Sequence, residues 1–334
     1  MKKFLLPTNT NSYKANLHCH TTVSDGIFTP EETKKRYLER GYSIIAFTDH
    51  NVLVPHNDLT DQNFLALNGY EIDVTEPYGP DGKPRKVCHL CMVALTPDNF
   101  NHVCYHRSKY VFGNALAYRD SLVYDKSLPD YEREYTPECI NDIVKKGKDA
   151  GFFVTYNHPV WSVEEFTDYS KYRGFDAMEI CNFSSAAIGF AEYNPMVYDE
   201  MLRACGKLYC VATDDNHKAH DCFGGFTVIR ADKLDYATIA KALKQGDFYA
   251  SQGPEIKDVW YEDGEFHITC APARSIDFTA DYRWAYSFSN SDGSPIEYAH
   301  IKLPEFGTFM RATVTDFNGY HANTNAYYIE DMLK

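Results

Sequence analysis

The sequence lacks long apolar runs and is short of positive charge. No segment approaches the ~18 consecutive apolar residues that a membrane-spanning helix needs, and Pro7 ends the opening apolar stretch too early for a signal peptide. Its 33 Lys and Arg stand against 47 Asp and Glu, which gives a net charge of −14. Because affinity for nucleic acid comes mostly from cationic contacts to phosphates, this balance argues against a broad nucleic-acid-binding surface. We expect a soluble, cytoplasmic protein without a membrane partner.

The sequence also lacks a disulfide framework. Its ten cysteines are scattered along 334 residues instead of crowding a short, loop-rich chain, so we expect reduced thiols. Cys88 and Cys91 form one CxxC with no second copy, which argues against a four-thiolate zinc site. With 44% apolar and 24% charged residues, the composition is globular, and the length favours one large domain with a smaller one.

The chain divides into two regions with different hydrophobic patterns. Residues 16–250 alternate short apolar runs with helical patterns, as βα units do, so we expect a first domain at residues 1–253. Thr29-Pro30-Glu31-Glu32, for example, is a helix start with a capping box. Residues 254–334 show period-two segments separated by turn signals such as Asp263-Gly264, which predicts a β-sandwich-like domain. Residues 100–134 are aromatic and charged with weak periodicity, which is typical of a lid or substrate loop.

Imidazole and carboxylate side chains collect where predicted strands end. The nine candidates are His18, His20, Asp25, His50, Glu71, His89, His158, Asp215 and His217. Only His89 falls inside a predicted strand. Because the carboxyl ends of the strands of a βα barrel converge on one face, these side chains are expected to meet there.

This donor set has a chemical preference. Imidazole and carboxylate without thiolate suit Zn, Mn or Fe at a catalytic site better than structural zinc. Nine donors are too many for one ion, and with bridging they suffice for two or three divalent ions.

Six segments together resemble the successive motifs of the PHP (polymerase and histidinol phosphatase) superfamily. They are Leu17–Gly26, Phe47–His50, Gly69–Glu71, His89–Leu90, Asn157–Pro159 and Asp215–His217. They follow the family's order over residues 16 to about 253, and every ligand position is filled. The resemblance implies a distorted (β/α)7 barrel with a two- or three-metal centre that hydrolyses phosphate esters.

The resemblance also implies how the ligands divide. The first metal would be held by His18, His20, Glu71 and Asp215. The second would share Glu71 with His89 and His158, and the third, completing a trinuclear centre, would take Asp25, His50 and His217. The tail resembles that of PHP proteins grouped as CehA/McbA-like metallohydrolases, whereas residues 100–134 match no pattern of the family.

The expected mechanism needs no covalent protein nucleophile. A hydroxide bridging two metals would attack phosphorus, as at other two-metal sites. Glu71 would fix the metal separation, and Asp25 or His217 would assist the leaving oxygen, so these three are the predicted catalytic residues.

Substrate contacts are predicted at polar or cationic side chains beside the Asp215/His217 pair, at a strand end and in the excursion at residues 100–134. Lys218, Asn182 and Arg107 are candidates for binding phosphate oxygens. The expected partner is a small phosphorylated compound such as a nucleotide; the oligomeric state is not predicted.

Two alternatives stay open. The same centre could hydrolyse an amide or carboxyl ester, which an assay of acyl-ester hydrolysis against phosphate release distinguishes. Alternatively, the chain is a non-catalytic glycan- or protein-binding module, although such a scaffold is expected to have lost ligands.

Overall fold

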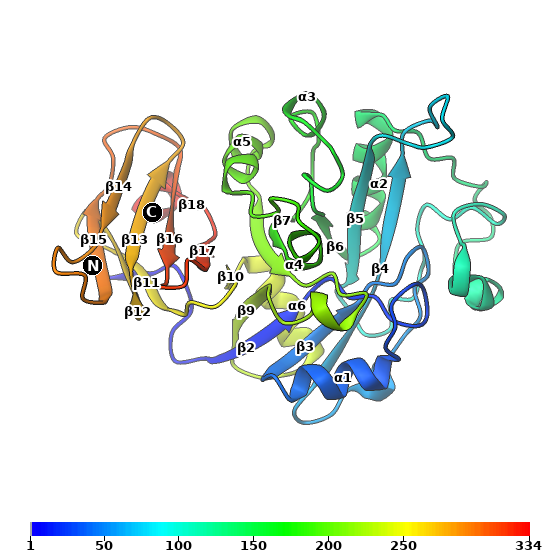
Figure 1. Cartoon of the computed structure of the whole chain (residues 1–334), viewed down its shortest axis with the longest axis horizontal. Helices are drawn as coiled ribbons and strands as arrows, with labels where there is room; N and C mark the ends of the chain where they lie inside the picture. The colour runs from blue at the N-terminus through cyan, green and yellow to red at the C-terminus, as the bar shows by residue number, and fades with distance from the viewer. Residues whose placement is uncertain (1) are drawn as a thin grey trace.

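The computed structural model describes residues 2–334 and has a mixed α/β fold. Figure 1 shows a larger part, coloured blue to yellow-green, beside a smaller strand-rich part coloured orange to red. A sheet of 14 strands runs through the larger part and into the smaller one, which adds a second sheet of four strands. The α/β class and the strand-rich C-terminal region are therefore as predicted.

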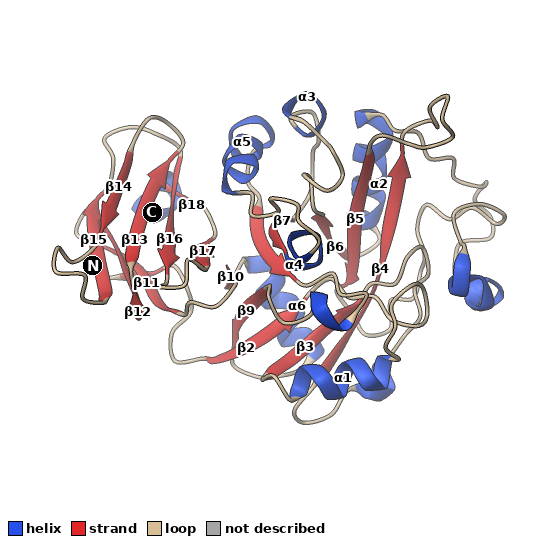
Figure 2. Cartoon of the chain, viewed as in Figure 1, coloured by secondary structure: helices blue, strands red, loops and turns tan. Residues whose placement is uncertain are grey.

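The larger part consists of strands with helices around them. Its strands are β2 (Asn11–Asn16), β3 (Tyr42–Phe47), β4 (Leu65–Thr75), β5 (Val87–Ala94), β6 (Phe152–Tyr156), β7 (Ala177–Asn182), β8 (Tyr209–Thr213), β9 (Phe226–Ala231) and β10 (Phe248–Ser251). Its α-helices are α1 (Pro30–Leu38), α2 (Pro137–Asp149), α3 (Phe166–Tyr169), α4 (Phe183–Ala187), α5 (Pro195–Cys205) and α6 (Tyr236–Gln245). Short 3-10 helices are η1 (Asn57–Leu59), η2 (Gly113–Ser121) and η3 (Ala219–Asp221). Helix α1 packs on β3, α2 on β6 and α6 on β9, on the outside of the strands (Figure 2).

Helix starts follow the local sequence signals. The Thr29 side chain accepts from the backbone N–H of Glu32, and the Glu32 carboxylate accepts from that of Thr29, which is the predicted capping box of α1. Asp235 caps α6 by accepting from the backbone N–H of Thr238. At the other end of α6, Gly246 adopts φ +74°, a left-handed conformation that glycine tolerates without strain.

Strand β5 departs from the parallel arrangement in the middle of the sheet, and β9 pairs antiparallel to β2 at the other side of this run of strands. The order β9-β2-β3-β4-β5-β6-β7-β8 is parallel at β2–β3, β3–β4, β6–β7 and β7–β8, but β5 is antiparallel to both β4 and β6. The reason is local: residues 76–86 join β4 to β5 without a helix, so the chain turns directly back. The sequence analysis predicted a barrel of parallel βα units, and at β5 this prediction is wrong.

The ends of the first and last predicted barrel strands approach each other. Within residues 2–334, no ladder of hydrogen bonds joins β8 to β2, but a parallel bridge links Cys19 to Asn216 just beyond them. There the backbone N–H of Asp215 donates to the carbonyl of His18 at 2.9 Å, and that of His20 donates to the carbonyl of Asn216 at 3.2 Å. Two segments that carry predicted ligands are thereby fixed side by side.

The smaller part contains the chain's first strand as well as its last ones. Its elements are β1 (Lys3–Phe4), β11 (Ile256–Glu262), β12 (Glu265–Ala273), β13 (Ser275–Ala280), β14 (Ala285–Phe288), β15 (Ile296–Lys302), β16 (Phe309–Thr315), β17 (His321–Thr324), β18 (Tyr327–Tyr328) and α7 (Ile329–Leu333). The four-stranded sheet has the order β1-β11-β12-β15, and buried residues such as Phe266 and Phe278 form the core between the two sheets. Strand β17 pairs with β10, so the large sheet crosses the predicted 253/254 boundary, which stays a prediction.

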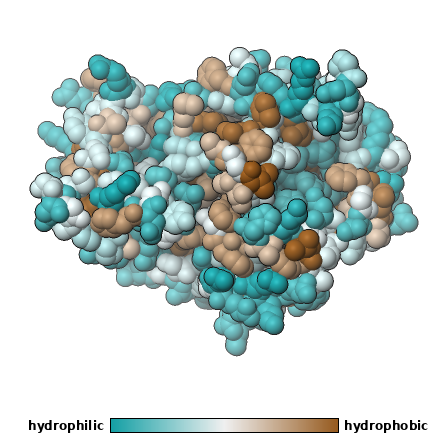
Figure 3. Space-filling view, viewed as in Figure 1, coloured by the Kyte–Doolittle hydropathy of each residue, from teal (hydrophilic) through white to brown (hydrophobic). Residues whose placement is uncertain are grey.

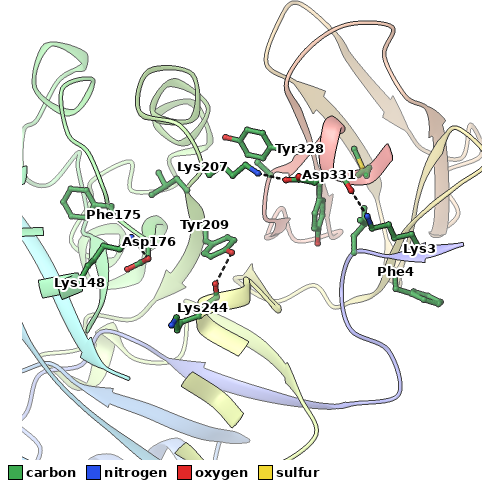
Figure 4. Close-up of a pocket in the computed structure, with 15 residues that line it drawn as sticks. Lys3, Phe4, Lys148, Phe175, Asp176, Lys207, Tyr209, Lys244, Tyr328 and Asp331 are labelled. Carbon is green, nitrogen blue, oxygen red and sulfur yellow. Dashed lines mark hydrogen bonds and ion pairs between the residues drawn. The ribbon is translucent and has the colours of Figure 1, made fainter. Parts of the chain in front are cut away.

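Polar contacts hold the two parts together. The guanidinium of Arg311 in β16 donates to both carboxylate oxygens of Asp199 in α5, at 2.7 and 2.9 Å. A crevice of about 480 Å³ lies between the parts. Figure 4 shows its lining residues, among which Lys207 forms an ion pair with Asp331 and Lys3 donates to the Asp331 carbonyl.

The excursion at residues 100–134 folds back onto the larger part. Its Tyr105 and Val111 pack with Val23 and Val52, which lie in the loops after β2 and β3. Near its end, Arg133 donates to the side-chain oxygen of Asn51 at 2.6 Å. The segment is therefore attached close to the ends of two ligand-bearing strands; its action as a lid stays a prediction.

Two expectations about the chain's environment can be compared with the structure. All ten cysteines are free, as predicted. Among residues 2–334, no helix is both long enough and apolar enough to cross a membrane.

Candidate metal centre

The nine predicted ligands converge on one site. His18 and His20 follow β2, His50 follows β3, Glu71 lies in β4, His89 in β5, His158 after β6, and Asp215 and His217 after β8. All are buried except His217, which is partly buried, and Asp25, which is exposed in the loop after His20.

The antiparallel direction of β5 explains the position of His89. His89 lies near the start of its strand and Glu71 lies within β4, whereas the other ligands lie beyond the ends of theirs. Because β5 runs against β4 and β6, its start is at the same edge of the sheet as their ends, and Nδ1 of His89 lies 3.1 Å from Oε1 of Glu71.

The innermost group consists of two imidazoles and two carboxylates. Nε2 of His18 and Nε2 of His20 are 3.0 Å apart, and each lies 3.0–3.1 Å from Oδ1 of Asp215. The same two nitrogens lie 3.2 and 3.3 Å from the two oxygens of Glu71. Four donors arranged tetrahedrally about 2.0–2.1 Å from one ion are about 3.3–3.4 Å apart. These four side chains therefore have the spacing of one metal site.

Glu71 is the centre of the whole group. Its Oε1 lies 3.1 Å from Nδ1 of His89 and 3.4 Å from Nε2 of His158, while its Oε2 lies 3.0 Å from Nδ1 of His50. Burial opposes ionisation of this carboxyl, yet the surrounding imidazoles hold its pKa well below its ordinary value. A carboxylate placed between two sets of imidazoles has the geometry of a bridging ligand.

A third group lies toward the solvent. Oδ2 of Asp25 is 3.7 Å from Nε2 of His50 and 3.5 Å from Nε2 of His217. His50 thus presents one ring nitrogen to Glu71 and the other to Asp25, so its imidazole links this group to the inner one. These longer distances describe a looser site than the innermost one.

Buried acceptors without hydrogen bonds indicate what the centre fits. Among the described residues, Oε2 of Glu71 and Oδ1 of Asp215 are buried and lack a hydrogen-bond partner, although imidazole nitrogens lie 3.0–3.3 Å away. Burial disfavours charged imidazoles at His18 and His20, but the nearby carboxylates raise the pKa of both well above the ordinary value. Both observations favour a positive charge where these side chains converge, so the residues present fit divalent metal ions.

The sequence analysis did not identify Glu179, a buried carboxylate that supports the ligands. Its Oε1 accepts from the Thr213 hydroxyl at 2.6 Å and lies 2.7 Å from Nδ1 of His18; its Oε2 accepts from the backbone N–H of His158 at 2.9 Å. The available signal was a single charged residue within an otherwise apolar strand, Ala177–Asn182. Partners of this kind fix the orientation of a ligating imidazole.

Asp49, next to His50, is a second support that was missed. Its carboxylate accepts from the backbone N–H groups of Thr21 and Ser24 at 2.8 and 3.1 Å, and from the hydroxyls of both residues. It therefore shapes the loop between His20 and Asp25.

A cavity of about 400 Å³ opens onto the centre. Its lining includes the ligands Asp25, His50, Glu71, His89, His158, Asp215 and His217, and also Trp161, Ser184, Ser185, Ile188, Lys218, His220 and Asp221. The predicted substrate residue Lys218 is thus at the cavity.

The other two substrate-binding candidates lie elsewhere. Asn182 is buried and donates to Glu179 at 2.9 Å and to Oδ2 of Asp215 at 3.1 Å. It therefore helps to orient the carboxylate of Asp215, a predicted metal ligand. Arg107 is paired with Asp130 at 2.7 Å within the excursion and does not line this cavity. Neither position supports direct contact with a substrate.

Comparison with known proteins agrees with this geometry. A family model described as PHP domain matches residues 16–145, which carry six of the nine ligands. No curated protein matches the chain.

Several solved structures are similar to this chain. One is a two-domain protein from Bacteroides vulgatus that contains a predicted PHP-like metal-dependent phosphoesterase; it is 14% identical, covers 98% of both chains and has a TM-score of 0.46. A second, described as a metal-dependent phosphoesterase from Bifidobacterium adolescentis, is 15% identical, with coverage of 63% of this chain and 89% of its own and a TM-score of 0.40. A third, an amidohydrolase from Chromobacterium violaceum, is 14% identical, with coverage of 70% and 96% and a TM-score of 0.40.

The family match defines the class: the chain contains a PHP domain, at residues 16–145, as the sequence motifs indicated.

Proposed function

We propose that the protein hydrolyses a small phosphate ester at a centre of two or three divalent ions, with Zn, Mn and Fe as the candidate metals. The observation that carries the proposal is the convergence of imidazole nitrogens on two buried carboxylates, each of which has one oxygen, Oε2 of Glu71 and Oδ1 of Asp215, without a hydrogen-bond partner within residues 2–334.

Each ligand group has a specific place in this proposal. His18, His20, Glu71 and Asp215 hold the first ion; Glu71, His89 and His158 hold the second; Asp25, His50 and His217 hold the third. When bound, the ions supply Lewis acidity that lowers the pKa of a water and neutralises the phosphoryl oxygens.

The residues at the mouth of the cavity handle the phosphate group and the protons. Lys218 provides a cation for a phosphoryl oxygen. His217 is oriented because its Nδ1 lies 2.8 Å from the Asp215 carbonyl, which leaves Nε2 facing Asp25 at 3.5 Å. If the third position is empty, these two side chains can share a proton and pass it to the leaving oxygen.

The test is an assay of phosphate release by the full chain loaded with Zn, Mn or Fe. We expect turnover of at least one small phosphomonoester or diester, and loss of at least 100-fold in Glu71→Gln. His300→Ala is the matched control, because it removes an exposed histidine of the smaller part. Release of acid from carboxyl esters or amides, without phosphate release, would contradict the proposal and favour the alternative, an amide or carboxyl-ester hydrolase. Full metal loading with no hydrolysis of either class would favour the binding module.

A further inference from the structure

Two apolar side chains line the cavity beside the metal centre. Trp161, in the loop after β6, and Ile188, at the end of α4, line the same cavity as His89 and His158. Ile188 is 58% exposed and Trp161 is partly buried, so both have surface left to bind a ligand. Figure 3 shows apolar side chains gathered on this face of the larger part, between α5 and β5.

The indole of Trp161 lies next to the ligands of the proposed second ion. Its ring centroid is 4.9 Å from that of His158, in an edge-to-face arrangement, and 5.4 Å from that of His89. A group bound against this ring would therefore lie beside the ligands of the proposed second ion. A substrate whose apolar portion is separated from phosphorus by a long polar linker would not reach it.

The loop that carries Trp161 is firmly held. Glu192, a buried residue, accepts from the backbone N–H of Trp161 at 2.7 Å and from that of Val160 at 3.3 Å. Three residues further along, the buried carboxylate of Glu164 accepts from the hydroxyl of Tyr156 at 2.7 Å. Because the ring is already positioned, little conformational entropy is lost when a ligand packs on it.

We propose that the substrate is a phosphate ester of a planar apolar alcohol, an aryl or arylmethyl phosphate, and that Trp161 and Ile188 bind the apolar group. This rests on the proposed phosphoesterase function. Lys218 and the metal ligands take the phosphate, whereas the Trp161 wall takes the ring through stacking and burial of apolar surface.

The kinetic test compares benzyl phosphate with glycerol 3-phosphate, two esters of primary alcohols. In the metal-loaded wild type, we expect kcat/KM for benzyl phosphate to exceed that for glycerol phosphate by at least tenfold. Trp161→Ala should reduce this ratio about tenfold, Ile188→Ala less, and Trp161→Phe should restore part of it. Phe166→Ala is the control, because it removes an exposed aromatic side chain of α3 that does not line the cavity and should leave the ratio unchanged.

Binding provides a readout independent of turnover. Calorimetry should show benzylphosphonate binding at least tenfold more tightly than methylphosphonate to wild type, and this difference should shrink in Trp161→Ala. Hydrolysis of both esters with equal kcat/KM, or a ratio that does not change in Trp161→Ala and Trp161→Phe, would overturn the inference and leave the phosphoesterase intact. Absence of phosphate release from every ester tested, by a metal-loaded wild type that binds neither phosphonate, would overturn both.

Discussion

The carboxylate of Glu179 lies 2.7 Å from Nδ1 of His18, on the side of the imidazole opposite the metal centre. With a proton on Nδ1, the Nε2 lone pair of His18 is directed toward Glu71 and Asp215, where the first ion is proposed. Strand β7 thus sets the orientation of a ligand that lies 161 residues earlier in the chain.

Replacement of Glu179 should therefore weaken metal binding without removing a ligand. In Glu179→Gln, we expect affinity for the tightest-bound ion to fall 10- to 100-fold, because the amide loses the charge that orients His18. Competition with a chelator of known affinity measures this. Glu165→Gln is the matched control, since Glu165 is exposed in the loop before α3; equal affinities in the two variants would contradict the assigned role.

A glycine in the loop after His20 should be essential because the backbone passes too close for a side chain. A Cβ at Gly26 would lie 2.5 Å from the carbonyl oxygen of His20 and 2.7 Å from the backbone nitrogen of Thr21. Gly26→Ala should displace His20 and Asp25 and reduce metal content by at least one ion per chain. Gly253→Ala, whose Cβ would meet nothing closer than 3.6 Å, should retain wild-type content. Normal metal content in Gly26→Ala would contradict this prediction, because it would show that the loop can move without loss of metal binding.

Glu164 should make the stability of the protein depend on pH. Burial raises the pKa of its carboxyl above the ordinary 4.5, although the hydroxyls of Tyr156, Tyr172 and Tyr135 act in the opposite direction. The folded state therefore holds this proton more tightly than the unfolded state does. The stability that protonation provides is present below pH 4.5 and is lost as the pH rises through the raised value.

The comparison that isolates this effect is urea unfolding of wild type and Glu164→Gln between pH 4 and pH 8. We expect the wild type to lose free energy of unfolding relative to the variant as the pH rises. A difference that stays constant, or changes in the opposite direction, would show that the hydrogen bonds from the tyrosines outweigh burial.

Metal removal should destabilise the larger part. An ion present at about 100 times its dissociation constant stabilises the folded state by about 2.7 kcal/mol, which corresponds to a Tm shift of roughly 5 °C for a part of this size. Calorimetry of the chelator-treated chain, with metal then restored, measures the shift. Identical Tm values in both states would contradict a centre built into the fold.

The ligands could be predicted from sequence because their positions repeat. His18, His50 and Asp215 each follow a strand, and the ends of neighbouring parallel strands meet at one edge. The same reasoning located the cap of α1 and the strand-rich tail. In each case the determining interactions are close in sequence or periodic.

The supporting residues could not be predicted in the same way. Glu179 contacts His18 across 161 residues, and Asn182 resembled a phosphate-binding residue until its contacts with Glu179 and Asp215 were seen. The direction of β5 depends on how the loop at residues 76–86 folds back, and the hydrophobic periodicity of the sequence does not predict that direction. Arg107 is occupied by Asp130, a partner 23 residues away.

The most direct test of the central claim is the number of metal ions per chain, measured by mass spectrometry on wild type, Glu71→Gln and the His300→Ala control after reconstitution. The account predicts two to three ions of Zn, Mn or Fe in wild type and in the control, and loss of at least one in Glu71→Gln, because Glu71 contacts both groups of imidazoles. Less than one ion in reconstituted wild type, or full content in Glu71→Gln, would contradict it.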